Sequence, residues 1–298
     1  MGKYLDPKND LPFKRIFGEH PELLKSFLNA LMPFEKNQYI RSLEYLSAEQ
    51  VPDNPAKKDS IVDVRCKDNR GRQFIVEMQV YWNNAFSNRM VFNASKAYVR
   101  QLDIGEDYTL LQPVYGLGII DDVFDRNTAE FYHHYKTINC RNNNEVIEGL
   151  EFVMIELPKF KPSTMMEKKM AVLWLRFLNE VEDNVYTLSD DLLKNRYIRQ
   201  AVELCEAGRF SPAELAAYDH YWDVIRTNTA VRKTERSEGL AEGMEKGLAE
   251  GMEKGKDEKL KEVVINGYKN GFSIEQIQVY SNLSREQIEK ILNSSKET

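Results

Sequence analysis

Two carboxylates and an amide lie close together in the stretch from Ile61 to Val80, IVDVRCKDNRGRQFIVEMQV. Apolar and polar residues alternate on both sides of the segment DNRG, which ends in glycine and suits a hairpin turn. The pattern predicts two short antiparallel strands. Asp63 would lie on the first strand, and Glu77 and Gln79 on the second.

The spacing predicts that the two carboxylates are neighbours. Side chains alternate between the faces of a strand, so Glu77 and Gln79 share one face. Pairing centred on Arg70 would place Asp63 directly opposite Glu77, with their Cβ atoms about 5 Å apart. A slip of one residue would put the carboxylates on opposite faces. We expect the other faces to meet the core and the carboxylates to lie on an exposed rim.

Such a pair of carboxylates suits metal-dependent chemistry. Two like charges side by side repel each other unless a positive charge lies between them. Mg²⁺ and similar divalent cations bind carboxylate oxygens and keep several waters. A cation held by Asp63 and Glu77 can activate water and stabilise charge on a phosphate oxygen, as phosphodiester cleavage requires. An ordinary hairpin with solvent-facing polar residues, and Arg65 paired with Glu77, explains the same pattern.

The elements that must position this hairpin follow from periodicity. Residues Leu11–Met32 have apolar side chains at helical spacing, with a restart or bend at Pro21. Another helix is expected after the hairpin, beginning near Asn83 or Asn84, because both are good caps. The apolar run PVYGLGIID predicts a strand buried on both faces. Two further strands follow. This order favours an α/β fold with a sheet flanked by helices.

The rest of the chain has a different character. Residues 163–234 show mostly helical patterns. The segment Gly239–Gly255, GLAEGMEKGLAEGMEKG, repeats an eight-residue unit with glycine at every fourth position. Helical spacing would put these glycines on one face, although each costs about 1 kcal/mol relative to alanine. The repeat fits a close helix–helix contact, such as that of a homodimer, or a flexible charged tether.

The last segment predicts a small helix-turn-helix-like module. Ser273 and Ser284 each precede a helical pattern and have glutamine three residues later, as in a capping box. Such units bind DNA in some proteins and only pack in others. The expected domains are residues 1–234, a charged glycine-repeat helix or tether over 235–260, and the module over 261–298.

Composition indicates a globular protein without a membrane segment. The chain has 298 residues, 42% hydrophobic and 30% charged. It contains no run of about 18 apolar residues, and its first residues lack the apolar core of a signal peptide. The three cysteines show no zinc-binding spacing, so we expect reduced thiols and a cytoplasmic location. The net charge of −6 argues mildly against a dedicated nucleic-acid binder.

Several segments together resemble one family. The order helix, strand, carboxylate hairpin, helix, strand is similar to the core of the PD-(D/E)XK nucleases. DLPFKRIFG, SIVDVRCKDNRGRQFIVEMQ, NRMVFNASKAYVRQL, YTLLQPVYGLGIID and the glycine repeat resemble the transposase-related, recombination-promoting nucleases of that superfamily. The resemblance covers roughly residues 1–234. It implies a restriction-endonuclease-like core with a helical C-terminal extension. The implied activity is Mg²⁺-dependent cleavage of DNA, linked to recombination or a mobile element.

The resemblance also implies roles for particular residues. Asp63 and Glu77 would bind Mg²⁺ or another divalent cation. Gln79 occupies the catalytic position where the wider superfamily usually has lysine. Because a glutamine amide is neutral, low activity, a cation supplied from elsewhere or a dead site would each explain this difference. Lys14 and Lys96 are candidates for the missing charge.

Other residues have a functional and a structural interpretation. Asp10 and Lys14 would complete the site from the first helix, or serve as a helix cap and a surface lysine. Arg89 would contact a phosphate or form a salt bridge. Tyr81 would support the site by a hydrogen bond or be an aromatic residue at its rim.

Two further functions fit the chain. A catalytically weak or inactive accessory protein that binds DNA or self-associates is favoured by Gln79 and by the net acidity. A protein-interaction module that binds no nucleic acid is favoured by the acidic C-terminal half.

Overall fold

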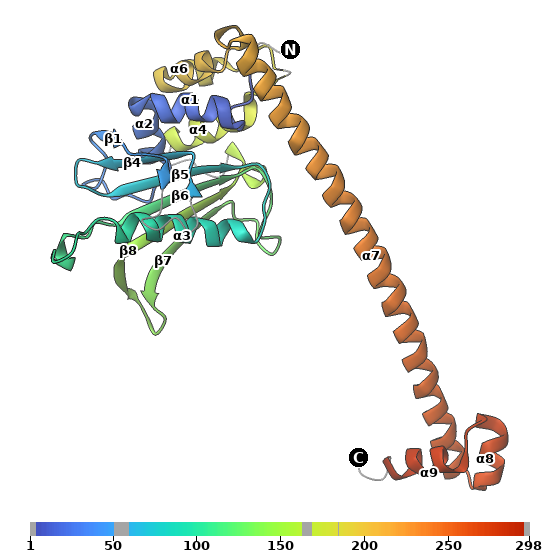
Figure 1. Ribbon diagram of the computed structural model, residues 1–298. Helices are drawn as coiled ribbons and strands as arrows, with labels where there is room; N and C mark the ends of the chain where they lie inside the picture. The colour runs from blue at the N-terminus through green and yellow to red at the C-terminus, as the bar shows by residue number, and fades with distance from the viewer. Residues whose placement is uncertain (1–3, 51–59, 163–168, 184, 295–298) are drawn as a thin grey trace. The chain divides into compact units, whose positions relative to one another are not determined.

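The structure is a computed structural model that describes residues 4–50, 60–162, 169–183 and 185–294 (Figure 1). The chain divides into two units, Met1–Trp222 and Asp223–Thr298. The borders expected at residues 234 and 260 both fall within a single helix, α7 (Pro212–Lys269). The division into three domains stays a prediction.

A six-stranded mixed sheet organises the first unit, with the strand order β1-β4-β5-β6-β8-β7. The strands β5, β6 and β8 are parallel to one another, and the other neighbours are antiparallel. A short pair, β2 and β3, lies outside this sheet. The bounds are β1 Leu43–Tyr45, β2 Glu49–Gln50, β3 Ser60–Ile61, β4 Val64–Asp68, β5 Gln73–Gln79, β6 Val114–Ile120, β7 Tyr132–Asn139 and β8 Asn142–Glu156.

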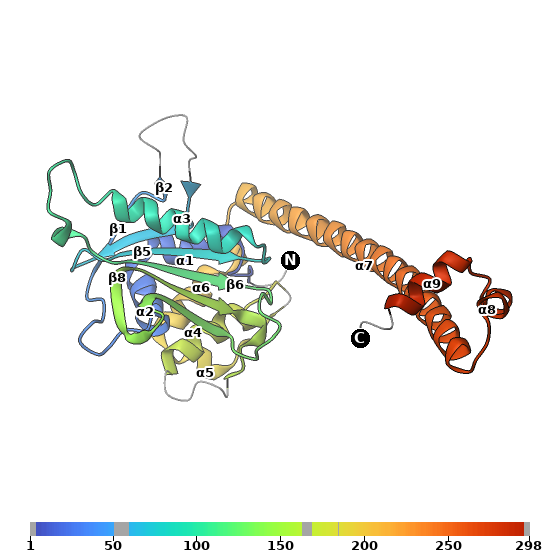
Figure 2. The ribbon, with the colours of Figure 1, turned by 90° about the horizontal axis from the view of Figure 1, so that it is seen from below.

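Helices cover both faces of the sheet (Figures 1 and 2). On one face lie α1 (Asp10–Glu19), α2 (Pro21–Leu31), α4 (Lys169–Glu180) and α6 (Arg196–Leu204), with the short α5 (Asp190–Leu193) beside them. The helix α3 (Ala85–Val99) covers the opposite face. The predicted mixed sheet flanked by helices, with a helical C-terminal extension, is confirmed.

Apolar side chains are buried on both faces of β5. On one face, Val76 belongs to a core that includes Phe17 and Trp174, whose ring centroids are 5.5 Å apart. On the other face, Ile75 packs with Phe86 of α3. The expectation that the carboxylate face is an exposed rim is therefore wrong for Glu77, which is only 3% exposed. The reason is that α3 folds back over this face directly after the hairpin.

The second unit contains most of α7 and the predicted pair of short helices, α8 (Ile274–Ser281) and α9 (Arg285–Ser294). Ser273 forms the predicted capping box with Gln276. Four buried residues make a small core: Val264, Ile277, Ile288 and Leu292. The glycine repeat lies within α7, and its glycines have open space around them. Within the described residues, no helix is long and apolar enough to cross a membrane.

Candidate active site

The hairpin has the predicted register. The ladder between β4 and β5 pairs Val64 with Val76 and Lys67 with Gln73. These pairs are symmetric about position 70, as expected. Asp63 lies in the bend immediately before β4, and Glu77 follows Val76 in β5. The ladder ends at the pair of Val64 and Val76, and Asp63 lies close enough to Glu77 for their charges to interact.

Asp63 lies at the bend before β4, half-buried. Its Oδ2 accepts a hydrogen bond of 2.7 Å from the main-chain N–H of Met78. Burial raises the pKa of Asp63 to about 6, although the Met78 N–H acts in the opposite direction. The nearby carboxylates of Asp10 and Glu77 raise this pKa further, and Lys14 lowers it. The site thus concentrates negative charge around Asp63.

Glu77 is buried, and both of its carboxylate oxygens are bonded. Oε2 accepts from Nη2 and Nε of Arg89, at 2.9 and 3.2 Å. Oε1 accepts from Nδ2 of Asn93 at 2.9 Å. Arg89 and Asn93 lie one turn apart on α3 and therefore face the same side. The helix that covers the sheet thus holds Glu77 in place.

Gln79 is joined to Glu77 through Arg89. Its Oε1 accepts from Nη2 of Arg89 at 2.8 Å, and its Nε2 donates to the main-chain oxygen of Tyr81 at 2.7 Å. Arg89 therefore bridges two of the three predicted catalytic residues. The salt bridge considered for this arginine is present, whereas Arg65 donates to Gln73 and not to Glu77.

Residues of α1 also reach the site. The Nζ of Lys14 lies 2.8 Å from Oδ1 of Asp10, and the charges of both side chains affect Asp63. The cap of α1 is Asn9, whose side chain accepts from the N–H of Leu11, so the suggestion that Asp10 is the cap is wrong. Asp10 instead begins the helix, where its carboxylate is close enough to raise the pKa of Asp63.

Lys96, the other candidate for the missing charge, makes its contacts with β2 and with a neighbouring aromatic ring. The Nζ of Lys96 donates to the main-chain oxygen of Gln50 in β2 and lies 5.4 Å from the centroid of the Phe92 ring. Tyr81 takes part through its main-chain oxygen, which accepts from Gln79. Asp63, Glu77, Gln79, Arg89, Asp10 and Lys14 are thus brought together.

Two residues of the site were missed from the sequence. Asn93 is fully buried and bonds Glu77, yet its Oδ1 has no hydrogen-bond partner in the described part of the chain. It is a polar residue within an apolar helix face, a signal that periodicity could have revealed. Tyr221 of α7 lies near Asp10 and Asp63. Burial first, and then these carboxylates, raise the pKa of Tyr221. No local pattern indicates this long-range contact.

A family comparison covers most of this structure. The model of the PD-(D/E)XK nuclease family transposases matches residues 7–231. The chain belongs to this family. The match includes the whole sheet and the candidate site, and the mixed sheet flanked by helices fits the restriction-endonuclease-like fold that the family implies. No curated protein matches the chain. No solved structure matches it either.

Nucleases of the PD-(D/E)XK class generally use divalent metal ions, and the chemistry of this site fits one. Among the described residues, no three or more His, Cys, Asp or Glu side chains are grouped so that they could hold a metal ion. Mg²⁺ nevertheless needs only one or two carboxylates, because it retains waters. Asp63 and Glu77 would supply these carboxylates, and the unpartnered Oδ1 of Asn93 is a further oxygen beside Glu77.

A second polar cluster adjoins the site at the end of β6. The main-chain N–H of Asp121 donates to the oxygen of Gln79 at 2.9 Å. The buried Nζ of Lys8 lies 3.3 Å from Asp121 and 3.6 Å from Asp6. Burial raises the pKa of Asp6 to about 7, although Lys8 lowers it. Lys8 is therefore held by carboxylates next to the strand that carries Gln79.

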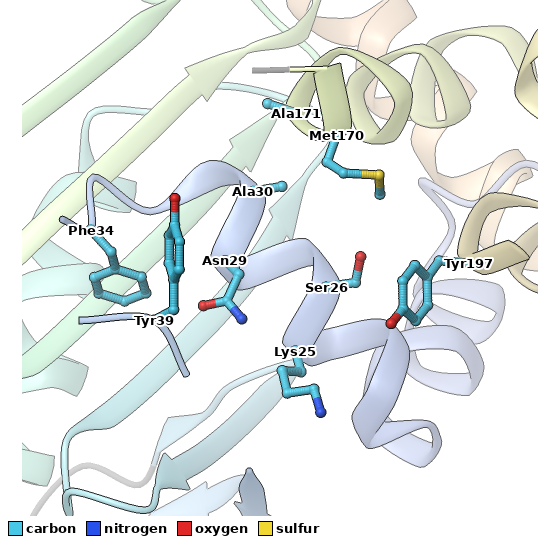
Figure 3. Close-up of a pocket in the computed structure, with 9 residues that line it drawn as sticks. All are labelled: Lys25, Ser26, Asn29, Ala30, Phe34, Tyr39, Met170, Ala171 and Tyr197. Carbon is cyan, nitrogen blue, oxygen red and sulfur yellow. The ribbon is translucent and has the colours of Figure 1, made fainter. Parts of the chain in front are cut away.

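The pocket between α2 and α4 does not coincide with this chemistry. It has a volume of about 380 Å³ and is lined by residues such as Ser26, Asn29 and Met170 (Figure 3). Two of its polar side chains already have partners, since Ser26 accepts from Trp174 and Asn29 bonds the main chain of Ile40. None of the candidate site residues lines this pocket.

Proposed function

We propose that this protein is a metal-dependent DNA endonuclease associated with recombination or a mobile element. Membership of a nuclease family linked to transposition supports hydrolysis of nucleic acid. The observation that carries the proposal is that Asp63 lies close enough to Glu77 for their charges to interact, beside Gln79 on the next strand of the hairpin.

In this proposal, Asp63 and Glu77 hold Mg²⁺ or another divalent cation. Such a cation supplies activation of water and stabilisation of negative charge on phosphate. The chain contributes orientation: the Met78 N–H holds Asp63, and Asn93 holds Glu77 through the oxygen that Arg89 does not contact. Gln79 lies beside them to position the water or another ligand. Hydrolysis joins the oxygen of water to phosphorus and breaks one P–O bond of the DNA backbone.

Incubation with supercoiled plasmid tests this function. Wild-type protein should nick the plasmid in Mg²⁺ and not in EDTA, and Asp63→Ala should not nick it in either condition. Equal nicking by both proteins would mean that the activity does not come from this site.

The alternative is a weakly active or inactive accessory protein that binds DNA. One observation favours it: Arg89 already supplies a positive charge to both Glu77 and Gln79. Titration calorimetry separates the two functions. Mg²⁺ binding that disappears in Glu77→Ala would contradict the alternative. A wild-type protein that shifts DNA in a gel but neither binds Mg²⁺ nor nicks would support it.

We also propose that the glycine repeat of α7 mediates a homodimer. The four larger apolar residues of the repeat, at every fourth position, are all exposed: Leu240, Met244, Leu248 and Met252. The neighbouring glycines leave open space on the helix. A row of larger side chains beside a row of glycines permits ridges of one helix to enter grooves of another. A second copy of the chain presents the same two rows.

A further inference from the structure

The site contains a cation in contact with the residue that stands in place of the usual lysine. Gln79 has no charge, but its Oε1 accepts from Nη2 of Arg89 at 2.8 Å. The same nitrogen lies 2.9 Å from Oε2 of Glu77. A single guanidinium group therefore lies between the carboxylate and the amide of the motif.

We propose that Gln79 and Arg89 together replace the lysine. Gln79 holds Arg89 at the site, and Arg89 supplies the positive charge that binds the scissile phosphate. We further propose that a divalent cation competes with Arg89 for Glu77, so that cation binding directs the guanidinium to the phosphate. This inference rests on the proposed nuclease function.

The surroundings of Arg89 suit this role. Its side chain is 45% exposed, whereas that of Glu77 is 4% exposed, so the guanidinium lies at the boundary between the buried carboxylate and solvent. The bonds of Arg89 to other described residues use Nε and Nη2, and none uses Nη1. A guanidinium can bond a phosphate through two parallel N–H groups. The group is thus accessible to a phosphate from the solvent side.

Neighbouring side chains would keep Glu77 and Arg89 in place when the guanidinium turns from the carboxylate to a phosphate. The guanidinium lies 5.1 Å from the centroid of the buried Phe86 ring, on the same helix. Asn93 bonds the other oxygen of Glu77 at 2.9 Å. The carboxylate therefore keeps one buried hydrogen bond when Arg89 leaves it, and Gln79 keeps Arg89 close to the site.

The other candidate lysines are bonded differently. Lys14 pairs with Asp10 at 2.8 Å, and Lys96 donates to the main-chain oxygen of Gln50. Neither has a contact with Gln79 comparable to the hydrogen bond from Arg89. The geometry therefore favours Arg89, and Lys96→Ala is a matched control because it removes a cation from the same helix.

Opposite effects on cation binding and cleavage would identify this role. Removal of Arg89 relieves Glu77 of a competing positive charge, so Arg89→Ala should bind Mn²⁺ about two- to tenfold more tightly in calorimetry without DNA. The same variant should nick supercoiled plasmid about 100-fold more slowly, because a charge on the phosphate is lost. A substitution that merely loosened the site would weaken both properties.

Placing a lysine at position 79 in the variant that lacks Arg89 completes the test. Gln79→Lys combined with Arg89→Ala should recover most of the nicking lost in Arg89→Ala, and Lys96→Ala should nick like the wild type. Far-UV circular dichroism and urea unfolding check the fold of each variant. If Arg89→Ala does not fold, Arg89→Gln replaces it, since its amide can still donate to Glu77.

Several results would overturn the inference. One is that Arg89→Ala nicks at the wild-type rate. Another is that Arg89→Ala binds Mn²⁺ no more tightly than the wild type. The third is that Gln79→Lys combined with Arg89→Ala recovers none of the nicking lost in Arg89→Ala. If the wild type does not nick at all, the proposed nuclease function fails. The Mn²⁺ affinities then still decide whether Arg89 competes for Glu77, and equal or weaker binding by Arg89→Ala rejects this competition.

Discussion

At the residue scale, the two carboxylates of the candidate site, Glu77 and Asp63, have different surroundings. Glu77 is buried against a guanidinium and an amide, which bond both of its oxygens. Asp63 is half-buried, is held by one main-chain N–H and lies near two further carboxylates. Burial and this negative charge raise the pKa of Asp63 to about 6. A site with excess negative charge is suited to accept a cation.

Asn93 offers a test of how Glu77 is held. Leucine has a similar volume but cannot bond the carboxylate, so Asn93→Leu leaves Glu77 with one hydrogen bond fewer. We expect Mg²⁺ affinity to fall about tenfold or more, corresponding to about 1.5 kcal/mol for a lost hydrogen bond to a charged group. Calorimetry measures this change. Met90→Leu, on the same buried face of α3, is the control and should keep wild-type affinity. Unchanged affinity in Asn93→Leu would reject a role for Asn93.

The buried Asp6 predicts a pH dependence of stability. Its pKa is raised from 3.8 to about 7, so between these values the folded state binds a proton more tightly than the unfolded state. Stability should therefore fall as the pH rises from about 4 to about 7. Each unit of pKa difference corresponds to about 1.4 kcal/mol. Urea unfolding of Asp6→Asn should show a smaller fall over this range. An equal fall in both proteins would contradict the assignment.

At the element scale, the site depends on close packing between α3 and the sheet. A Cβ atom added to Gly116 of β6 would lie 2.7 Å from Cδ1 of Phe152 and 2.8 Å from Cε of Met90. Gly116→Ala should therefore lower the free energy of unfolding by about 1 to 3 kcal/mol. Urea unfolding monitored by fluorescence measures this loss. Gly208→Ala, where the space is also open, should not lower stability. Equal stability of Gly116→Ala and the wild type would contradict the packing.

The hairpin shows how far the sequence predicts the site. Alternation over Ile61–Val80 and the glycine-bearing turn define the strand pair and its register, because a slip would expose the apolar face. Local alternation could not show that Glu77 is buried, since this depends on α3 returning over the sheet. The contact of Arg89 with Gln79 likewise joins a helix to a strand. Tyr221 comes from a helix more than a hundred residues away in the sequence.

At the scale of the whole molecule, the family match covers nearly all of the first unit and only the beginning of the second. The match ends at residue 231, soon after the first unit ends at Trp222. The remaining α7 segment has exposed apolar residues and glycines with open space. The candidate site thus lies within the first unit, and self-association is proposed for the second.

The glycine row of α7 predicts an effect on self-association. Replacing Gly243, Gly247 and Gly251 by alanine should favour the helix by about 1 kcal/mol per position, but the added methyl groups would prevent close approach of a second helix. Sedimentation velocity should therefore show a weaker dimer, and far-UV circular dichroism should show a higher helix content. The control is the double variant Glu245→Gln with Glu253→Gln. Each of these glutamates lies two residues after a glycine, and therefore about 200° around the helix from the glycine row. A dimer unaffected by the alanines would contradict this interface.

The central claim is that Asp63 and Glu77 form the cation site of a DNA endonuclease. The most direct measurement is the rate of plasmid nicking against Mg²⁺ concentration for the wild type and Asp63→Asn, which keeps the size of the side chain. We predict that the wild-type rate rises to saturation and that Asp63→Asn, although folded, does not nick at any concentration. Nicking by Asp63→Asn with the wild-type dependence on Mg²⁺ would contradict the claim.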